Sequence, residues 1–431
     1  MTEVRLDSPV FTRQDGWRYG LMGLPLAFVA LPLYVLLPNH YARAFGVQLA
    51  TVGLLLLGAR LFDAIIDPLL GRWSDRLFAR SPAAVLRWAG VAAVGLAGGF
   101  VALFFPPVQS PGALLVWVSA ALALTYAAYS AVGVMHQSWG AMLGGDEVQR
   151  SRVVAWREGL GLVGVILASI SPVALGLPAT VALFFIALTT GWIAWRSAVR
   201  PPSVATPEAA SPPATAPARP AWGLPFTRPA FRALLVVFVV NGIASAVPAT
   251  LLLFFVQDRL QAPQSWEPLF LGSYFLCAAV AIPLWLRLVG RIGLARSWGI
   301  GMLLSISVFG FAAGLDAGDN SAFLVVCALS GAALGTDLAV PGALLAGVIA
   351  ASGDRGRAEG AYFGWWNFAT KLNLALAAGI ALPVLGALGY VPGTRDPAAL
   401  QTLSIAYCLL PCALKLLAAT LLYFLHLRKT P

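Results

Sequence analysis

The chain has 431 residues, of which 59% are hydrophobic and only 11% are charged, a composition that excludes an ordinary soluble globular protein. A formal net charge of +10 can indicate a nucleic-acid-binding protein. However, the Lys and Arg residues concentrate in the termini and in alternate loops between apolar segments. This is the positive-inside pattern of a membrane protein with both ends in the cytoplasm, and it argues against nucleic acid as a partner.

Twelve apolar segments are long enough to cross a bilayer at about 20 residues per helix. Six precede a Pro- and Ala-rich stretch, at residues 18–38, 48–71, 85–106, 112–135, 153–175 and 178–199. Six follow it, at residues 231–257, 266–290, 296–315, 321–351, 359–390 and 400–427. The order predicts an all-α polytopic membrane protein with an N-terminal six-helix bundle (1–199), a flexible cytoplasmic linker (200–229) and a C-terminal six-helix bundle (230–431). Kinks are predicted at Pro25, Pro32, Pro248 and Pro341.

Three ionisable side chains, Arg60, Asp63 and Asp67, lie within the second apolar segment. Steps of three and four residues place them on one face of a helix. A charge at the bilayer centre costs about 2.5–3.5 kcal/mol on insertion scales, so this face is expected to meet a wet or protein-lined interior. The carboxylate pair is therefore a candidate site for a coupling cation, H⁺ or Na⁺.

The residues that follow this segment, Gly71, Asp75 and Arg76, have the spacing Gly-x-x-x-Asp-Arg. This spacing resembles the signature loop of the major facilitator superfamily, in which the Asp lies near a helix end and pairs with basic groups. An ordinary positively charged loop would explain the Arg but not the Gly and Asp. We therefore expect these three residues to form a conformational latch.

The segment Arg-x-x-Asp-Ala-x-x-Asp-Pro at residues 60–68 is the first of several blocks that resemble one branch of that superfamily. The others are residues 136–142, the run from Asp146 through Arg150 to Arg157, and Arg357-Ala-Glu-Gly360 followed by Lys371. Together they resemble the glycoside-pentoside-hexuronide:cation symporters, the melibiose-permease-like branch. The resemblance implies the major facilitator fold, transport by alternating access and no enzymatic activity.

The sequence departs from that branch at the expected ion and sugar ligands. The resemblance implies a sodium site with an Asn and a fourth-helix hydroxyl, but Ile66 and Gly133 stand there. Sodium requires several hard oxygens, whereas a proton requires only one suitably basic carboxylate, so H⁺ is favoured over Na⁺. The two acids that would hold a sugar are replaced by Leu26 and His136.

The remaining polar and aromatic side chains of the presumed cavity are the candidate solute-binding residues. They are His136, Trp139, Arg157, Asn367 and Asp337. A lone membrane His is more often a packing residue, and Asp337 could instead cap a helix distortion near Pro341.

Two lysines lie inside apolar segments. Lys371 lies about 12 residues, or roughly 18 Å, inside its segment, and we expect it to balance the carboxylates, together with Arg60, when the cation has left. Lys415 could face the cavity or reach a lipid headgroup, and both readings stay open at this point.

These features predict a secondary active transporter that moves a small solute, a sugar, glycoside or organic anion, by cation symport. It is expected to be a monomeric, multi-pass protein of a bacterial inner membrane with no cofactor and no bound metal. Two alternatives share the same carboxylates: a lipid or lysolipid transporter of the same fold, and a proton-driven efflux antiporter. The string Gly159-x-Gly-x-x-Gly164 has no strand before it, so it indicates close helix packing rather than nucleotide binding.

Overall fold

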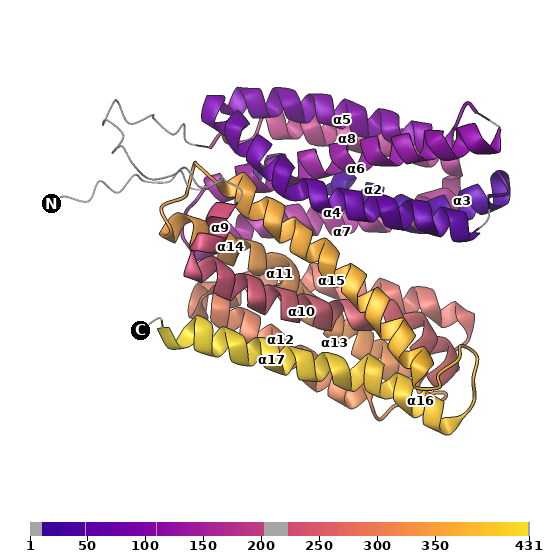
Figure 1. The fold of residues 1–431 in the computed structure, drawn as a ribbon. Helices are drawn as coiled ribbons and strands as arrows, with labels where there is room; N and C mark the ends of the chain where they lie inside the picture. Colours follow the sequence, from indigo (N-terminus) through magenta and orange to yellow (C-terminus); the bar gives the residue numbers. More distant parts are fainter. Residues whose placement is uncertain (1–10, 48, 109, 202–222, 430–431) are drawn as a thin grey trace. The chain divides into compact units, whose positions relative to one another are not determined.

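The structure is a computed structural model that describes residues 11–47, 49–108, 110–201 and 223–429 (Figure 1). The described residues form helices, short helical turns and loops, and no strand. Nine helices among them are long and apolar enough to cross a membrane. The predicted all-α polytopic architecture is confirmed.

The described residues from 11 to 228 form nine α-helices and one π-helical turn. They are α1 (Arg13–Gly20), α2 (Gly23–Leu31), η1 (Pro32–Leu36), α3 (Leu37–Ala44), α4 (Leu49–Arg80), α5 (Pro82–Phe104), α6 (Pro111–Met142), α7 (Glu147–Leu175), α8 (Leu177–Arg196) and α9 (Leu224–Thr227). Polar side chains fix where several of them begin. Ser81 caps α5 and Asp146 caps α7, each accepting a hydrogen bond from a backbone amide of the first turn, as expected of helix N-caps.

The described residues of the second half are also helical. Its elements are α10 (Pro229–Phe254), η3 (Phe255–Arg259), η4 (Gln264–Trp266), α11 (Glu267–Ile292), α12 (Leu294–Ala312), α13 (Asn320–Ala339), α14 (Pro341–Ala351), α15 (Glu359–Ala387), α16 (Pro397–Ser404), η5 (Ile405–Leu409), α17 (Leu410–Leu425) and η6 (Leu427–Lys429). η3 and η5 are π-helical turns, and η4 and η6 are 3₁₀ turns.

Prolines account for two of the interruptions. η1 begins at Pro32, and α13 gives way to α14 at Pro341, because proline lacks the amide that the helix ladder needs. The predicted distortions at these two positions are confirmed. Pro25 and Pro248 instead lie inside α2 and α10, which continue past them.

The chain divides into two compact units. The first comprises Met1–Arg228 together with Ala346–Phe368, and the second comprises Pro229–Leu345 together with Ala369–Pro431. The second unit thus begins next to the predicted bundle boundary at residue 230, but the first unit also takes in α9, part of α14 and the first turns of α15. Most of the predicted linker, residues 202–222, lies outside the described residues.

Each unit has its own apolar core. In the first unit α5 packs against α6 and α8, and α2 packs against α7. In the second unit α11 packs against α13, and α17 against α10 and α12. Aromatic rings fill both interiors, including Phe100 and Phe184 in the first core and Phe255, Phe323 and Tyr407 in the second. These two scaffolds position the polar side chains described below.

Candidate functional site

The two acidic residues in the apolar part of α4, Asp63 and Asp67, are turned into the first unit. Asp63 is 1% exposed and Asp67 is fully buried, whereas Leu61 and Ile65 on the outer face of the same helix are 55% and 64% exposed. A helix has 3.6 residues per turn, so a step of four keeps both carboxylates on the face that packs toward α6. The predicted placement of this pair away from lipid agrees with the structure.

A serine of α6 completes the surroundings of Asp63. The hydroxyl of Ser130 donates a hydrogen bond of 2.6 Å to Asp63 Oδ1, and both side chains are buried. The sequence analysis placed the expected hydroxyl position at Gly133, but the structure shows the hydroxyl one turn earlier on the same helix, at Ser130. The signal was available, because a step of three residues returns to the same helix face. A second hard oxygen therefore lies beside the carboxylate.

Arg60 and Lys371, the cationic residues expected near the pair, have different surroundings. Arg60 is exposed, so the expected single buried stripe on α4 holds only for the two acids. Its long side chain can leave the packed layer and carry its charge outward. Lys371 belongs to the second unit and is half-buried on α15. Their role in charge compensation stays a prediction.

Asp75 caps the start of α15, inside the first unit. Its carboxylate accepts hydrogen bonds from the backbone amides of Gly360 at 2.6 Å and Ala361 at 2.9 Å. These amides belong to the first turn of a helix, where unsatisfied N–H groups and the helix dipole favour a negative charge. The expected partners were basic side chains, and Arg76 is exposed. The Asp is thus near a helix end as predicted, but it holds backbone amides.

The close approach of α4 and α15 explains why the motif has a glycine at position 71. A Cβ built on Gly71 would lie 2.1 Å from the carbonyl oxygen of Gly360, and a Cβ on Gly360 would lie equally close to the carbonyl of Gly71. Gly364 shows the same crowding one turn further, because its Cβ would lie 2.6 Å from the backbone oxygen of Asp67. Three glycines therefore let α4 and the first turns of α15 touch backbone to backbone, from the latch to the level of the buried carboxylates.

A second anchor in the same unit was not predicted from the sequence. Asp354, in the turn before α15, accepts hydrogen bonds from Arg228 Nε at 2.9 Å and Arg228 Nη2 at 2.7 Å. The hydroxyl of Tyr362 donates to the same carboxylate at 2.7 Å. Arg228 lies between α9 and α10, outside the spans, and its hydrogen bonds with Asp354 raise its pKa. The bidentate geometry ties the end of the linker region to the entrance of α15.

His136 and Trp139, predicted to bind solute, are packed inside the first unit. His136 is fully buried, its Nε2 lies 2.8 Å from the carbonyl oxygen of Tyr19, and its ring stacks on the Tyr19 ring at 4.3 Å. Trp139 is also fully buried and donates its indole N–H to the carbonyl of Val199 at 3.0 Å. The geometry of both is that of packing residues, which was the alternative weighed for His136.

Arg157 and Asn367 are the other predicted solute ligands in the first unit. Arg157 lies on α7, is largely buried and forms an ion pair with its neighbour Glu158. Asn367 is half-buried on α15. In the described part of the structure, neither side chain is hydrogen-bonded to His136 or Trp139. Their solute-binding role stays a prediction.

Asp337 belongs to an ion pair in the second unit, in which Lys415 is buried and the Asp337 side chain is 15% exposed. Its Oδ2 lies 3.1 Å from Nζ of Lys415, and its Oδ1 accepts hydrogen bonds from Asn241 Nδ2 at 3.0 Å and the Trp298 indole N–H at 2.8 Å. Helices α10, α12, α13 and α17 each supply one of these groups. Asp337 therefore does not cap the break at Pro341, and Lys415 faces the interior of the unit rather than a headgroup.

The fold and these polar groups define a class of protein. Long apolar helices enclose a buried carboxylate pair, and a glycine-lined helix contact ends at Asp75, which caps α15. The described residues contain no group of His, Cys, Asp and Glu side chains that could hold a metal ion. The long apolar helices define a polytopic membrane protein.

Comparison with known proteins identifies the family. Residues 18–429 match the MFS_2 family, described as MFS/sugar transport protein. Because the match covers nearly the whole chain, the protein belongs to this family and is a transporter of the major facilitator superfamily rather than an enzyme.

Two relatives come from Escherichia coli (strain K12). One, named "Putative glycoside/cation symporter YagG", is 29% identical over 168 residues, or 38% of this chain and 35% of that protein. The other, named "Inner membrane symporter YicJ", is 26% identical over 156 residues, or 36% of this chain and 33% of that protein. The matched regions span about a third of each relative's length.

Solved structures share the fold. A bacterial homologue of the iron transporter ferroportin, in an outward-facing state, superposes with a TM-score of 0.67 at 18% identity, covering 96% of this chain and 98% of that chain. The fucose:proton symporter FucP of Escherichia coli superposes with a TM-score of 0.62 at 13% identity, covering 93% and 98%. At these identities the likeness concerns the fold alone.

Proposed function

We propose that this transporter carries a small solute, a sugar or glycoside or an organic anion, by symport with a cation. The observation that carries the proposal is the buried pair Asp63 and Asp67 with the Ser130 hydroxyl at 2.6 Å from Asp63. Acids inside apolar membrane segments are costly and typically mark ion pathways, proton relays or substrate sites. The names of the two relatives, "Putative glycoside/cation symporter" and "Inner membrane symporter", support the same class.

The proposed coupling ion is H⁺ rather than Na⁺. The position of Ile66 lacks an oxygen ligand, and a buried pair of acids can exchange a proton without further ligands. The Ser130 hydroxyl reduces the preference for H⁺ over Na⁺, because it offers sodium one of the hard oxygens that Gly133 does not supply. Uptake driven separately by a pH gradient and by a Na⁺ gradient distinguishes the two ions.

In the proposed cycle, cation binding at the carboxylates permits solute binding, and the two bundles expose the loaded site alternately to each side. Lys371 and Arg60 compensate the carboxylates after the cation leaves. The protein is proposed to act as a monomer in a bacterial inner membrane, with both termini in the cytoplasm.

The test is gradient-driven uptake into proteoliposomes, with a pH or a Na⁺ gradient imposed separately across a panel of sugars, glycosides, organic acids and lysolipids. Accumulation above the external concentration is expected with one gradient for at least one small solute. Export against the gradient would instead identify an antiporter, and uptake of lysolipids alone would identify a lipid transporter.

Asp63→Asn is expected to abolish this accumulation, since it removes the ionisable group but keeps the size of the side chain and a hydrogen-bonding oxygen for Ser130. Asp316→Asn is the matched control, because Asp316 is exposed and lies between α12 and α13. Undiminished accumulation by Asp63→Asn would exclude this carboxylate as the coupling group.

A further inference from the structure

A pocket inside the second unit has no role in the coupling scheme above. It has a volume of about 250 Å³ and lies among α10, α11, α12, α13 and the segment of η5 and α17. Its size is close to the lower limit of small-molecule sites, which are typically about 300–1,000 Å³. It can therefore hold a ligand with one or two rings.

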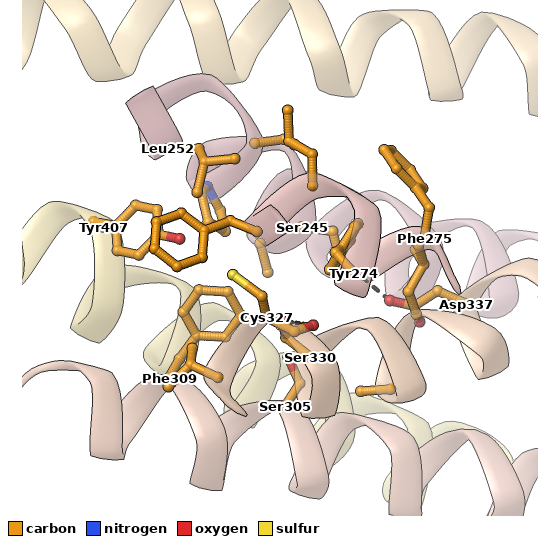
Figure 2. Close-up of a pocket in the computed structure, with 18 of the residues that line it drawn as sticks. Ser245, Leu252, Tyr274, Phe275, Ser305, Phe309, Cys327, Ser330, Asp337 and Tyr407 are labelled. Atoms are coloured by element: carbon orange, nitrogen blue, oxygen red, sulfur yellow. Dashed lines mark hydrogen bonds between the residues drawn. The ribbon is translucent and has the colours of Figure 1, made fainter. Parts of the chain in front are cut away.

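Most of the wall is apolar and aromatic. Figure 2 shows the rings of Tyr274, Phe275, Phe309 and Tyr407 around the pocket, with Leu252 beside them. Aromatic faces of this kind bind ring-shaped ligands by stacking and by burial of apolar surface. The greater part of the ligand must therefore be an apolar body.

The pocket wall contains one negative and one positive side chain, whose charges cancel. Asp337, Lys415 and Ser245 lie there. Nζ of Lys415 donates to Asn241 Oδ1 at 2.9 Å, to the Ser245 hydroxyl at 3.1 Å and to Asp337 Oδ2 at 3.1 Å. These contacts use all three protons of the ammonium group, and the single carboxylate cancels its charge.

This neutrality selects among ligands. A ligand with a net charge would leave an uncompensated charge in an apolar site, which is expensive unless the charge is paired. A hydroxyl or amide group is both donor and acceptor, so it can join the Asp337 and Lys415 network without that cost. An uncharged polar end therefore fits better than a carboxylate or an ammonium group.

The backbone around the pocket is irregular at two points. Tyr407 lies on the π-helical turn η5, and its ring stacks on Phe255 of η3 at 4.2 Å. Asp337 lies just before the break between α13 and α14 at Pro341. π-Helical turns occur frequently at functional sites, and here one of them presents an aromatic ring to the pocket.

We propose that this pocket binds an uncharged amphiphile, with its ring-sized apolar body against the aromatic wall and its hydroxyl- or amide-bearing end at Asp337 and Lys415. The binding claim is independent of cation coupling. Only the further step, that this ligand is the transported solute, rests on the proposed function. If the pocket ligand is the transported solute, organic anions are no longer candidate solutes.

The test is equilibrium binding of radiolabelled probes to the purified full-length protein in nanodiscs. The probes are the neutral phenyl glucoside, phenyl galactoside and phenyl xyloside, and the anionic phenyl glucuronide, each with two rings. At least one neutral probe is expected to bind about tenfold more tightly than the glucuronide, and more tightly than the corresponding free sugar. Tighter binding of the glucuronide, or no binding of any neutral probe, would overturn the proposal.

Two variants locate the binding. Ala249 lines the pocket and is exposed, so Ala249→Phe should fill the space without disturbing the core and weaken binding about tenfold. Val236→Phe is the control, because Val236 is an exposed residue of the same helix α10 outside the pocket. Equal binding by Ala249→Phe and the wild type would place the probe elsewhere and reject the pocket.

A charge variant tests the selection rule. Asp337→Asn leaves Lys415 without its carboxylate, so the preference for the neutral probe over the glucuronide should fall about tenfold. An unchanged preference would contradict the role of the pair. Cation-driven accumulation measured on the same variants separates the two proposals. Loss of accumulation only in Asp63→Asn with intact probe binding supports the coupling site, whereas accumulation by Ala249→Phe equal to wild type shows that the pocket ligand is not the solute.

Discussion

At the scale of single residues, the account rests on oxygen and charge placed where a membrane protein rarely tolerates them. Asp63 is buried beside the hydroxyl of Ser130, and the partly buried Asp337 is paired with the buried Lys415. The proposed coupling role of Asp63 requires its carboxylate to bind and release a cation. Asp337 is paired with Lys415, so this pair is suited to hold an uncharged polar group. The two acids are thus proposed to have different roles, one in coupling and one in ligand binding.

Ser130→Ala tests the first of these neighbours. Loss of the hydroxyl removes a hydrogen bond to a charged group, worth about 1.5–3 kcal/mol in typical proteins. The hydroxyl favours the charged form of Asp63, so its loss should make H⁺, the proposed coupling ion, bind about tenfold more tightly. For Na⁺ the same change removes an oxygen ligand and should weaken binding about tenfold. Both are measured as the ion concentration for half-maximal uptake. Ser130→Thr should keep the affinity close to that of the wild type.

Ser119→Ala supplies the control for that measurement. Ser119 lies on the same helix α6, where its exposed hydroxyl only bonds back to the carbonyl of Leu115. A similar change in ion affinity for Ser119→Ala and Ser130→Ala would show that the contact with Asp63 has no specific role.

Lys415→Met tests the ion pair with Asp337 through stability. Removing one partner of a buried pair typically costs about 3–5 kcal/mol, whereas replacing both partners is often nearly neutral. Asp337 would remain charged with a side chain that is 15% exposed, so a cost at the lower end of this range is expected. The thermal unfolding midpoint of Lys415→Met is therefore expected to fall clearly, and the double variant Asp337→Asn with Lys415→Met should recover much of the loss. Additive losses in the double variant would contradict a coupled pair.

At the scale of elements, the contact between α4 and the start of α15 shows what the Gly-x-x-x-Asp-Arg spacing does. The glycine allows the backbones to meet, and four residues later, about one turn along the helix, the carboxylate reaches the first amides of the facing helix. Both residues are needed for one contact, so the spacing follows from the pitch of α4.

Gly71→Ala measures that contact. Alanine favours helix over glycine by about 1 kcal/mol, but its Cβ at this position would lie 2.1 Å from the carbonyl oxygen of Gly360. The unfolding midpoint is expected to fall, because the helices must separate. Gly58→Ala on the same helix is the control, since no atom outside its immediate helix surroundings lies within 4 Å of the added methyl group. A stabilising effect at both positions would show that the close contact is unimportant.

The local pattern of the sequence predicted the elements but only part of the site. Helical segments, the burial of Asp63 and Asp67, and the breaks at Pro32 and Pro341 follow from periodicity, charge and proline chemistry along one stretch of chain. The contacts of Asp75 with residues about 285 positions away and of Asp337 with Lys415 depend on how helices meet. Ser130 could have been found by extending the search one turn, whereas the packing of His136 could only be weighed as an alternative.

At the scale of the whole molecule, the chain is a transporter of the major facilitator superfamily whose polar chemistry is divided between two compact units. The first unit holds the carboxylates and the Asp75 cap of α15, and the second holds the Asp337–Lys415 ion pair and the aromatic pocket. The division suggests separate variants for separate functions. Substitutions at Asp63 should change coupling, and substitutions around the pocket should change what is bound.

The most direct test of cation coupling measures ion entry driven by a solute gradient, instead of solute uptake driven by an ion gradient. A solute identified by uptake is added outside proteoliposomes that have no imposed ion gradient, and the entry of H⁺ or Na⁺ is recorded with a trapped indicator. The account predicts that solute moving down its gradient carries the cation inward in the wild type, and that Asp63→Asn still equilibrates solute but carries none. Solute entry without any cation flux, or an undiminished flux in Asp63→Asn, would contradict it.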